Sequence, residues 1–454
     1  TAVEFDNALV IRNGGFMIST SRRVVITGMG VISPLGSDKD ALWDNLAGGR
    51  SGVTPVTLAS AGAFPMAVAA EVSDFHGKID QFGPLEKEQK KAIRKGLKVM
   101  CRECQMAVAA AQGALSDAGL APGTFDPCRT GINFGSDYML TQPEEFTEGI
   151  LQCLNEDGRF EFSRWAPEGM PKMSPLWLLK YLPNMPASHI AIYNDLRGPN
   201  NSLTLREASP NLAVAEAFQT IRQGRADVML AGATGTRLHP MKMLHVVQQE
   251  EVSPGDGDPS KISRPFDRRR TGMVLGEGAG AVVLEELGRA LQRGAAIYAE
   301  VLGGGASSVA DRNLVARRDE AMRNALAAVL RNTGAGPNDI GSLHAHGLST
   351  RLGDMEEAWA VDQVFGARSK PLPVTAAKSY FGHLGAGSGL VELVTSVLAL
   401  KHGRLFGILN YEDPDPQCPI AGVKETADPG DSFVNLSVTP QGQASAVLVH
   451  RFEG

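Results

Sequence analysis

Short β-branched or apolar runs alternate with longer amphipathic stretches along this chain. Residues 22–28 (RRVVITG) are a β-branched run that enters a turn rich in glycine and proline, and the apolar spacing over 38–46 predicts a helix. A long helix is predicted for 89–118, ending near Gly119, and a short strand for 130–135. Strands that alternate with helices in this way predict an α/β layered fold with much parallel sheet.

The stretch NSLTLREASPNLAVAEAF, residues 201–218, joins a short apolar strand to an apolar helix. Ser209 and Pro210 suit the N-cap and the first position of that helix. Two opposite charges, Arg206 and Glu207, stand at the junction. A charged pair between two elements that both read as buried indicates a functional position.

Two pairs of segments have similar sequences. Residues 278–284 and 443–449 are both small-residue runs that lead into valine and leucine, and 296–302 is a loose counterpart of 22–28. These similarities are weak signs of an internal duplication. If the chain has two related halves, they meet near residues 260–295.

The bulk composition is that of a globular protein of more than one simple core. The chain has 454 residues, of which 43% are hydrophobic and 21% charged. Its net charge of −6 argues against non-specific nucleic-acid binding, which needs a strongly basic face. A cationic run between residues 90 and 98 could meet an acidic partner, although a solvated helix face is the favoured interpretation.

The cysteines and apolar runs indicate a reduced, soluble protein. Five cysteines in a chain of this length do not form a disulfide framework, and Cys101 and Cys104 read as two thiols on one helix. No apolar run reaches 18 residues, and the first residues lack the features of a secretory signal. We expect a cytoplasmic protein with no membrane span and no nucleic-acid partner.

Two histidines stand in loops of small and hydroxyl residues. His346 lies in LHAHGLSTRLGD, and His383 lies in AAKSYFGHLGAGSG with Lys378 five residues before it. Such groups at strand ends form a plausible acid/base and electrostatic site, although satisfied structural histidines are the alternative for either one alone. Acidic residues accompany them at Asp354, Glu357 and Glu392.

Metal, nucleotide and hydrolase sites have little support. His344 and His346 would face the same way on a strand, but no third ligand stands at a metal-type spacing. Residues 276–280 (GEGAG) only superficially resemble a phosphate loop, and the chain has no GK[ST] or GxSxG motif. We therefore expect neither a metal nor a bound cofactor.

The order of several segments resembles the β-ketoacyl-ACP synthases (ketosynthases) of the thiolase superfamily. The resemblance covers nearly the whole chain from Arg22. It rests on RRVVITGMGVISPLG, LRGPNNSL, ADVMLAGAT, SRPFDRRRTGMVLGEGAG, AHGLSTRLGD, AAKSYFGHLGAGSG and NYEDPDP.

The resemblance implies a duplicated, thiolase-like α/β/α/β/α fold of five layers. After an N-terminal extension at 1–21, the first half would span 22–270 and carry the nucleophile position, and the second would span 271–454 with both histidine motifs. It also implies a thioester substrate on a phosphopantetheine arm of acyl carrier protein or coenzyme A. A homodimer, or a heterodimer with a cysteine-bearing ketosynthase, is the implied assembly.

The same resemblance assigns roles to the loop residues. His346 and His383 take the positions of the two catalytic histidines. The supporting polar positions of the family fall on Lys378, Asp354, Glu357 and Glu392.

This sequence departs from the family pattern in two places. The family's nucleophile is a cysteine, and counting from Gly198-Pro199 places that position on Glu207. The glycine-rich NSFGFGGTN-like loop of the family, which supplies an oxyanion-hole N–H and a gating aromatic, is rebuilt here around Thr439 and Pro440. We expect Glu207 to be ionised and paired with a histidine or lysine, with Arg206 as a candidate counter-charge.

Three functions remain open at this point. The first is decarboxylation of a malonyl thioester, because His346, His383 and Lys378 are retained. The second is a non-condensing partner subunit that resembles the chain-length factors. The third is an acyl transfer to a free thiol or amine with His346 or His383 as base.

Overall fold

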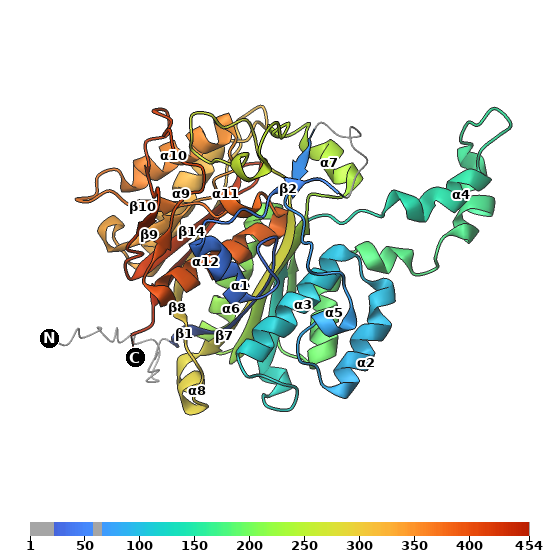
Figure 1. Ribbon diagram of the computed structural model, residues 1–454. Coiled ribbons are helices and arrows are strands. Elements are labelled where there is room, and N and C mark those ends of the chain that lie inside the picture. Colours follow the sequence, from blue (N-terminus) through green and yellow to red (C-terminus); the bar gives the residue numbers. More distant parts are fainter. Residues whose placement is uncertain (1–21, 58–65, 454) are drawn as a thin grey trace.

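The computed structural model describes residues 22–57 and 66–453, so the predicted extension at 1–21 lies outside the described residues. One mixed sheet of 11 strands runs through the molecule (Figure 1). Its strands are β1 (Val24–Ile32), β4 (Thr130–Gly135), β5 (Asn200–Leu203), β6 (Val228–Thr236), β7 (Glu277–Glu286), β8 (Ala299–Ser308), β9 (Ser342–His344), β10 (Pro373–Thr375), β12 (Ala421–Gly422), β14 (Ser432–Val438) and β15 (Gln443–Arg451).

Two short ladders and a set of helices complete the fold. The ladders pair β2 (Thr54–Pro55) with β3 (Val68–Ala69) and β11 (Leu405–Phe406) with β13 (Thr426–Ala427). The helices are α1 (Lys39–Ala47), α2 (Lys87–Gly96), α3 (Arg102–Asp117), α4 (Thr147–Gln152), α5 (Met185–Asn194), α6 (Ser209–Arg222), α7 (Pro240–Val246), α8 (Leu287–Gln292), α9 (Arg318–Thr333), α10 (Arg351–Phe365), α11 (Lys378–Phe381) and α12 (Ser388–His402).

The same arrangement of five strands occurs twice in the sheet, which accounts for the segments of similar sequence. The first set lies in the order β5-β4-β6-β7-β1 and the second in the order β10-β9-β14-β15-β8. In both sets the first three strands are parallel and the last two pairings are antiparallel. The sets join where β1 pairs with β8 over Val24–Ile26. The predicted division at residue 270 precedes β7, the strand that completes the first set.

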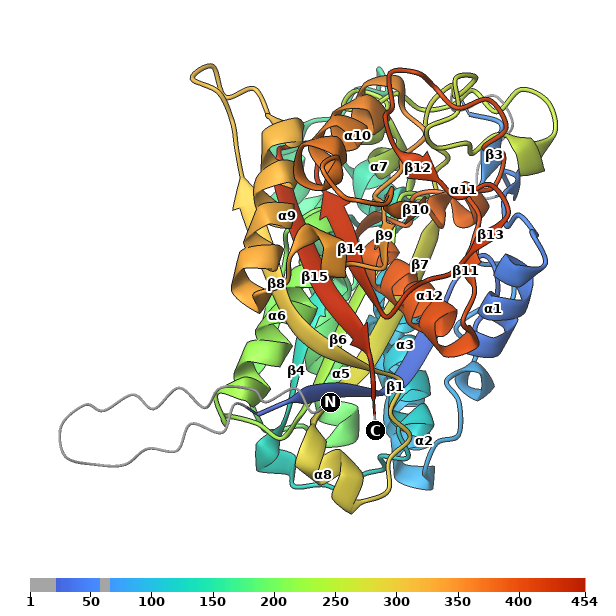
Figure 2. The same ribbon diagram turned by 90° about the vertical axis from the view of Figure 1, so that its left-hand side faces the viewer.

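Helices separate the two sets into layers. Helices α3 and α5 pack with the strands of the first set, whereas α9 packs on β8, β14 and β15 with α10 beside it (Figure 2). Helices α6 and α12 contact strands of both sets and lie in the central core. This arrangement gives the α/β/α/β/α layering that the sequence predicted.

The predicted helix over 89–118 is wrong in its continuity. Helix α2 ends at Gly96, and after a turn the backbone is extended at Met100 and Cys101 before α3 begins. The two helices also meet different surroundings. Most residues of α2 are solvent-exposed, whereas α3 is buried over most of its length, so one straight helix could not serve both.

The predicted turn rich in glycine and proline begins later than expected, because β1 continues to Ile32 and the turn lies at 33–36. The glycines of this strand allow α3 to approach it. A Cβ on Gly30 would lie 2.1 Å from the carbonyl oxygen of Ala110, which is backbone and cannot move aside easily. Small residues therefore serve close packing in this strand rather than a turn.

Between Phe162 and Tyr181 the chain forms short 3₁₀ and π turns. Together with α4 this segment forms an arm that stands away from the body of the molecule (Figure 1). The arm has its own aromatic cluster of Phe146, Phe160, Trp165 and Trp177. Among the described residues, no helix combines the length and apolar character needed to cross a bilayer.

Gly30→Ala should lower the free energy of unfolding by about 1–3 kcal/mol, because the added methyl overpacks the contact between β1 and α3. Gly113→Ala, on the opposite side of that contact, is the matched control. Its Cβ would lie 3.5 Å from the Gly30 Cα, an ordinary distance, and alanine favours the helix. Urea unfolding of both variants measures the difference, and equal losses would contradict the packing argument.

Candidate active site

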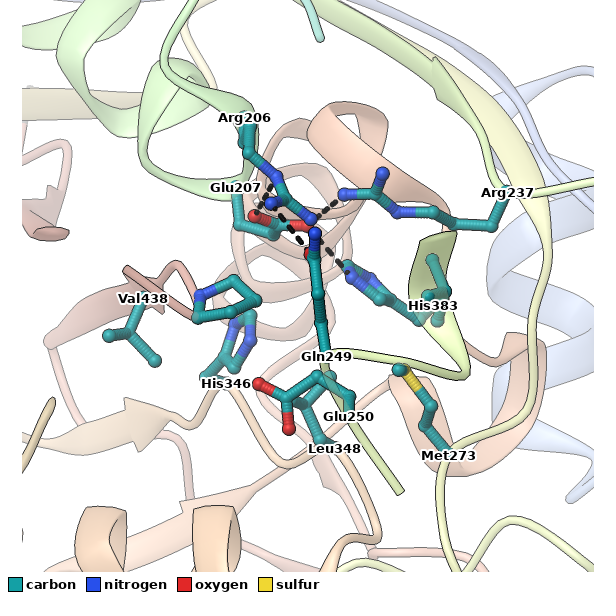
Figure 3. A pocket seen from close by; sticks show the side chains of 12 residues that line it. Arg206, Glu207, Arg237, Gln249, Glu250, Met273, His346, Leu348, His383 and Val438 are labelled. Carbon is teal, nitrogen blue, oxygen red and sulfur yellow. Dashed lines mark hydrogen bonds and ion pairs between the residues drawn. The ribbon is translucent and has the colours of Figure 1, made fainter. Parts of the chain in front are cut away.

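The predicted site residues meet at the seam between the two strand sets (Figure 3). Glu207 belongs to a one-turn 3₁₀ helix between β5 and α6, and His346 follows β9. Lys378 begins α11, and His383 lies just beyond its end. The ring centroids of His346 and His383 are 6.0 Å apart, so the structure brings together the two histidines that the sequence assigned to one site.

The carboxylate of Glu207 is buried and doubly held. Its Oε1 lies 3.0 Å from His383 Nε2 and also accepts a hydrogen bond from Arg237. Burial alone would raise the pKa of Glu207, but the charge of Arg237 and the hydrogen bond from His383 hold it well below its usual range. Glu207 is therefore an anion, as expected, although its strongest counter-charge is an arginine that the sequence did not suggest.

Arg237 links Glu207 to a second carboxylate. It follows β6 directly, its side chain is 0% exposed, and its Nη1 forms an ion pair with Asp137 Oδ2 at 2.5 Å. Sequence reasoning missed both Arg237 and Asp137. The available signal was a charge immediately after each of two apolar strands, and pairing them requires knowing that β4 and β6 are neighbours.

The protonation of His383 follows from its partners. An ionised carboxylate can only accept, so Nε2 carries the hydrogen that points at Glu207. On the other side of the ring, Nδ1 lies 3.3 Å from Ser388 Oγ. Burial lowers the pKa of His383 to about 4, although Glu207 opposes the shift. His383 is therefore neutral at physiological pH and donates to Glu207.

His346 is oriented by Lys378. The Lys378 Nζ donates to the His346 carbonyl oxygen at 2.6 Å, lies 3.3 Å from its Nδ1, and forms an ion pair with Glu392. Because the ammonium can only donate, Nδ1 accepts and the ring hydrogen is on Nε2. That Nε2 has no hydrogen-bond partner among the described residues. Burial and the charge of Lys378 hold the pKa of His346 well below its usual range.

Two buried carboxyl groups hold the loop that carries His346. Glu357 accepts from the backbone N–H of His346 at 2.6 Å and of Gly347 at 2.8 Å. Asp354 accepts from the N–H of Phe266 and of Ser349. Burial raises the pKa of Glu357 to about 8 and that of Asp354 to about 6. Asp354 and Glu357 therefore fix backbone geometry and do not line the cavity beside Glu207.

The space beside Glu207 is small. It has room for about one water molecule, and both histidines, Arg206 and Arg237 border it. Val438 and Pro440 line it from the rebuilt loop, whereas Thr439 points elsewhere and its Oγ1 accepts from the N–H of Gln443 within the turn. The projecting arm contributes no residue to this lining, so the arm is not a lid over it.

Other reactive groups lie apart from this cavity. His344 is held by Ser396 and by the N–H of Ala377, so it does not share a ligand set with His346. In residues 22–57 and 66–453, no three His, Cys, Asp or Glu side chains are grouped to hold a metal ion. The described cysteines, of which Cys101 and Cys104 are buried at the start of α3, do not line the cavity either.

Comparison with known proteins assigns most of the chain to one family. The family models "Beta-ketoacyl synthase, N-terminal domain" and "Beta-ketoacyl synthase, C-terminal domain" match residues 21–290 and 298–412. The 3-oxoacyl-[acyl-carrier-protein] synthase 2 of Coxiella burnetii is 34% identical over 409 residues, covering 89% of this chain and 92% of the relative.

Solved structures of the same kind are also similar. The ishigamide ketosynthase/chain length factor has a TM-score of 0.78 at 28% identity, over 96% of this chain and 100% of that chain. A type II polyketide acyl-carrier protein in complex with its ketosynthase includes a chain with a TM-score of 0.80 at 25% identity, with the same coverage.

Arg237→Met should lower the free energy of unfolding by about 3–5 kcal/mol, because it leaves two buried carboxylates without their counter-charge. Adding Glu207→Gln to that variant should recover part of the loss, since one of the stranded charges is removed. Arg197→Ala, which breaks an exposed pair with Asp195, is the control and should leave the free energy of unfolding nearly unchanged. If the losses in free energy of unfolding of the two single variants simply add in the double variant, the pairing of Glu207 with Arg237 is contradicted.

The contribution of His383 to stability should fall as the pH is lowered from 7 to 4, whereas the raised pKa values of Glu357 and Asp354 act in the opposite direction. The folded pKa of His383, about 4, lies below the value of about 6.5 for a free histidine, so the unfolded state binds more protons between these values. The depressed pKa of Glu207 acts in the same direction below about pH 4.5. Urea unfolding of this chain and of His383→Gln across the range isolates that contribution, and the difference between their free energies of unfolding should shrink towards pH 4. An NMR titration in which His383 protonates near pH 6.5 would contradict the burial argument.

Proposed function

The chain belongs to the β-ketoacyl synthase family, and from that premise we propose that it is a non-condensing subunit that pairs with a cysteine-bearing ketosynthase. The family places it among the ketosynthase-like proteins of fatty-acid and polyketide biosynthesis. Within that setting the proposed role is that of a chain-length-factor-like partner.

The observation that carries the proposal is the state of Glu207. Glu207 falls at the family's nucleophile position when the chain is counted from Gly198-Pro199. A carboxylate there would give a mixed anhydride, which is far less stable than a thioester, so it is a poor acyl acceptor. The ion pair with Arg237 weakens its nucleophilicity further, because the anion is already neutralised.

The Glu207 carboxylate also accepts the hydrogen bond that one of the two histidines would otherwise offer to a substrate. His383 Nε2 is the group that would stabilise a developing negative charge on a bound thioester, and it donates to Glu207 instead. The remaining space admits about one water molecule, so an acyl group would have to displace protein side chains. The geometry therefore favours a closed site over an acyl-enzyme cycle.

An acyl carrier protein is the proposed source of the thioester. Helix α2 and the turn that follows it present a row of exposed cations on a chain of net charge −6, which suits an acidic docking partner. This is the partner class named for the similar ketosynthase complex. The exposed cations are Lys87, Lys90, Lys91, Arg94, Lys95 and Lys98.

A surface cleft next to the cavity suits a phosphopantetheine arm. The cleft shares Gln249 and Glu250 with the cavity, and Thr350 and Arg318 also line it. Thr350 is buried, and its Oγ1 has no hydrogen-bond partner among the described residues. A hydroxyl in this state can bond the amide groups of a pantetheine chain.

A second candidate is decarboxylation of a malonyl thioester. It is favoured by the unpartnered Nε2–H of His346, which faces the cavity and could donate to the enolate oxygen left when carbon dioxide departs. The anionic Glu207 opposes it, because the malonyl carboxylate would enter beside a like charge.

One set of measurements separates the two candidates. The protein should co-purify with the cysteine-bearing ketosynthase of its own gene neighbourhood, and it should form no acetyl thioester from malonyl-ACP or malonyl-CoA between pH 5 and 8, as followed by mass spectrometry. Acetyl product that disappears in His346→Ala would establish the decarboxylase instead. Glu207→Gln, which removes the like charge, is the matched variant and should raise any such activity. If the protein forms a homodimer and does not bind that ketosynthase, the proposal of a non-condensing partner subunit is wrong.

A further inference from the structure

Arg206 joins three segments around the cavity, and its side chain is only 15% exposed (Figure 3). Its Nη1 donates to Gln249 Oε1 at 3.0 Å and to Gln441 Oε1 at 3.1 Å. Its Nε lies 3.5 Å from Glu207 Oε2 without forming a hydrogen bond. The guanidinium therefore makes its hydrogen bonds to two neutral amides, and its ion pairs with Glu207 and with Asp137 Oδ1, at 4.0 Å, are long.

The two glutamines come from segments that are far apart in the chain. Gln249 follows α7, and Gln441 lies in the turn between β14 and β15, next to the cavity-lining Pro440. Both glutamines are solvent-exposed, so water can replace the arginine as their partner at little cost. Arg206 thus ties the two segments together through bonds that can be exchanged.

The backbone of Arg206 is in a conformation that side-chain contacts must maintain. Its φ is 53°, in the left-handed region that residues with a Cβ rarely adopt. Such residues persist where the surroundings hold them, and they are common at switch positions. By contrast, Arg237 on the other side of Glu207 is fully buried between two carboxylates and has no such freedom.

We propose that Arg206 is an access latch for this cavity. With its side chain across Gln249 and Gln441, the space beside Glu207 is closed to anything larger than about one water molecule. When the side chain swings into solvent, the two segments separate, and the cavity opens to the cleft that shares Gln249 with it. The latch does not depend on whether the site condenses, decarboxylates or only binds, so its test needs no activity.

A thiol placed at the base of the cavity reports its opening. Glu207→Cys would be alkylated with iodoacetamide, and the labelling rate at position 207 would be followed by peptide mass spectrometry. Adding Arg206→Ala should speed this labelling roughly tenfold, the shift expected from losing two hydrogen bonds of ordinary net strength. Adding Arg197→Ala, an exposed arginine, is the matched control and should leave the rate unchanged.

Internal controls distinguish a local latch from general loosening. Cys104, Cys153 and Cys418 are buried elsewhere, and their labelling should stay slow in every variant. Gln249→Leu with Gln441→Leu removes the partners while leaving Arg206 in place, and it should also speed labelling at position 207. An unchanged rate at 207 in the Arg206→Ala background, or an equal rise at all buried cysteines, overturns the latch.

Discussion

A buried arginine between two carboxylates is the constraint on which the site depends. Arg237 contacts Asp137 and Glu207, and with Arg206 beside them the four charges sum to zero. Arg237, Asp137 and Glu207 are almost fully buried, and none of these three can be removed alone without leaving a charge in a space that water scarcely reaches. The position of Glu207 is therefore fixed by charge compensation, and the hydrogen bond to His383 follows from that position.

The duplicated fold explains why these groups meet at all. Glu207 leaves the first strand set at the start of α6, whereas His346 leaves the second set after β9. Because α6 and α12 lie between the two sets, the loops at their ends converge on one seam. Each half supplies part of the site, and neither half could build it alone.

Features set by residues close together in the sequence could be predicted, whereas features set by contacts between remote residues could not. The alternation of strands and helices and the pairing of an ionised Glu207 with a histidine could be anticipated from local patterns and the resemblance to a family. The break between α2 and α3 could not, because it is set by which faces the rest of the chain buries. Arg237 was missed for the same reason: its partner Asp137 is remote in sequence, and only the pairing of β4 with β6 brings them together.

The retained histidine and lysine motifs do not by themselves require catalysis. Lys378 and Glu392 neutralise each other in the interior, so losing either one would strand a buried charge. Lys378 also holds the His346 carbonyl oxygen, and Glu357 holds the N–H of the same residue. A chain that had no use for condensation would still need these groups to keep the loop after β9 in place. The polar network is thus compatible with a closed, non-condensing site, and the unpartnered Nε2 of His346 is the one group in it whose hydrogen the fold leaves unused among the described residues.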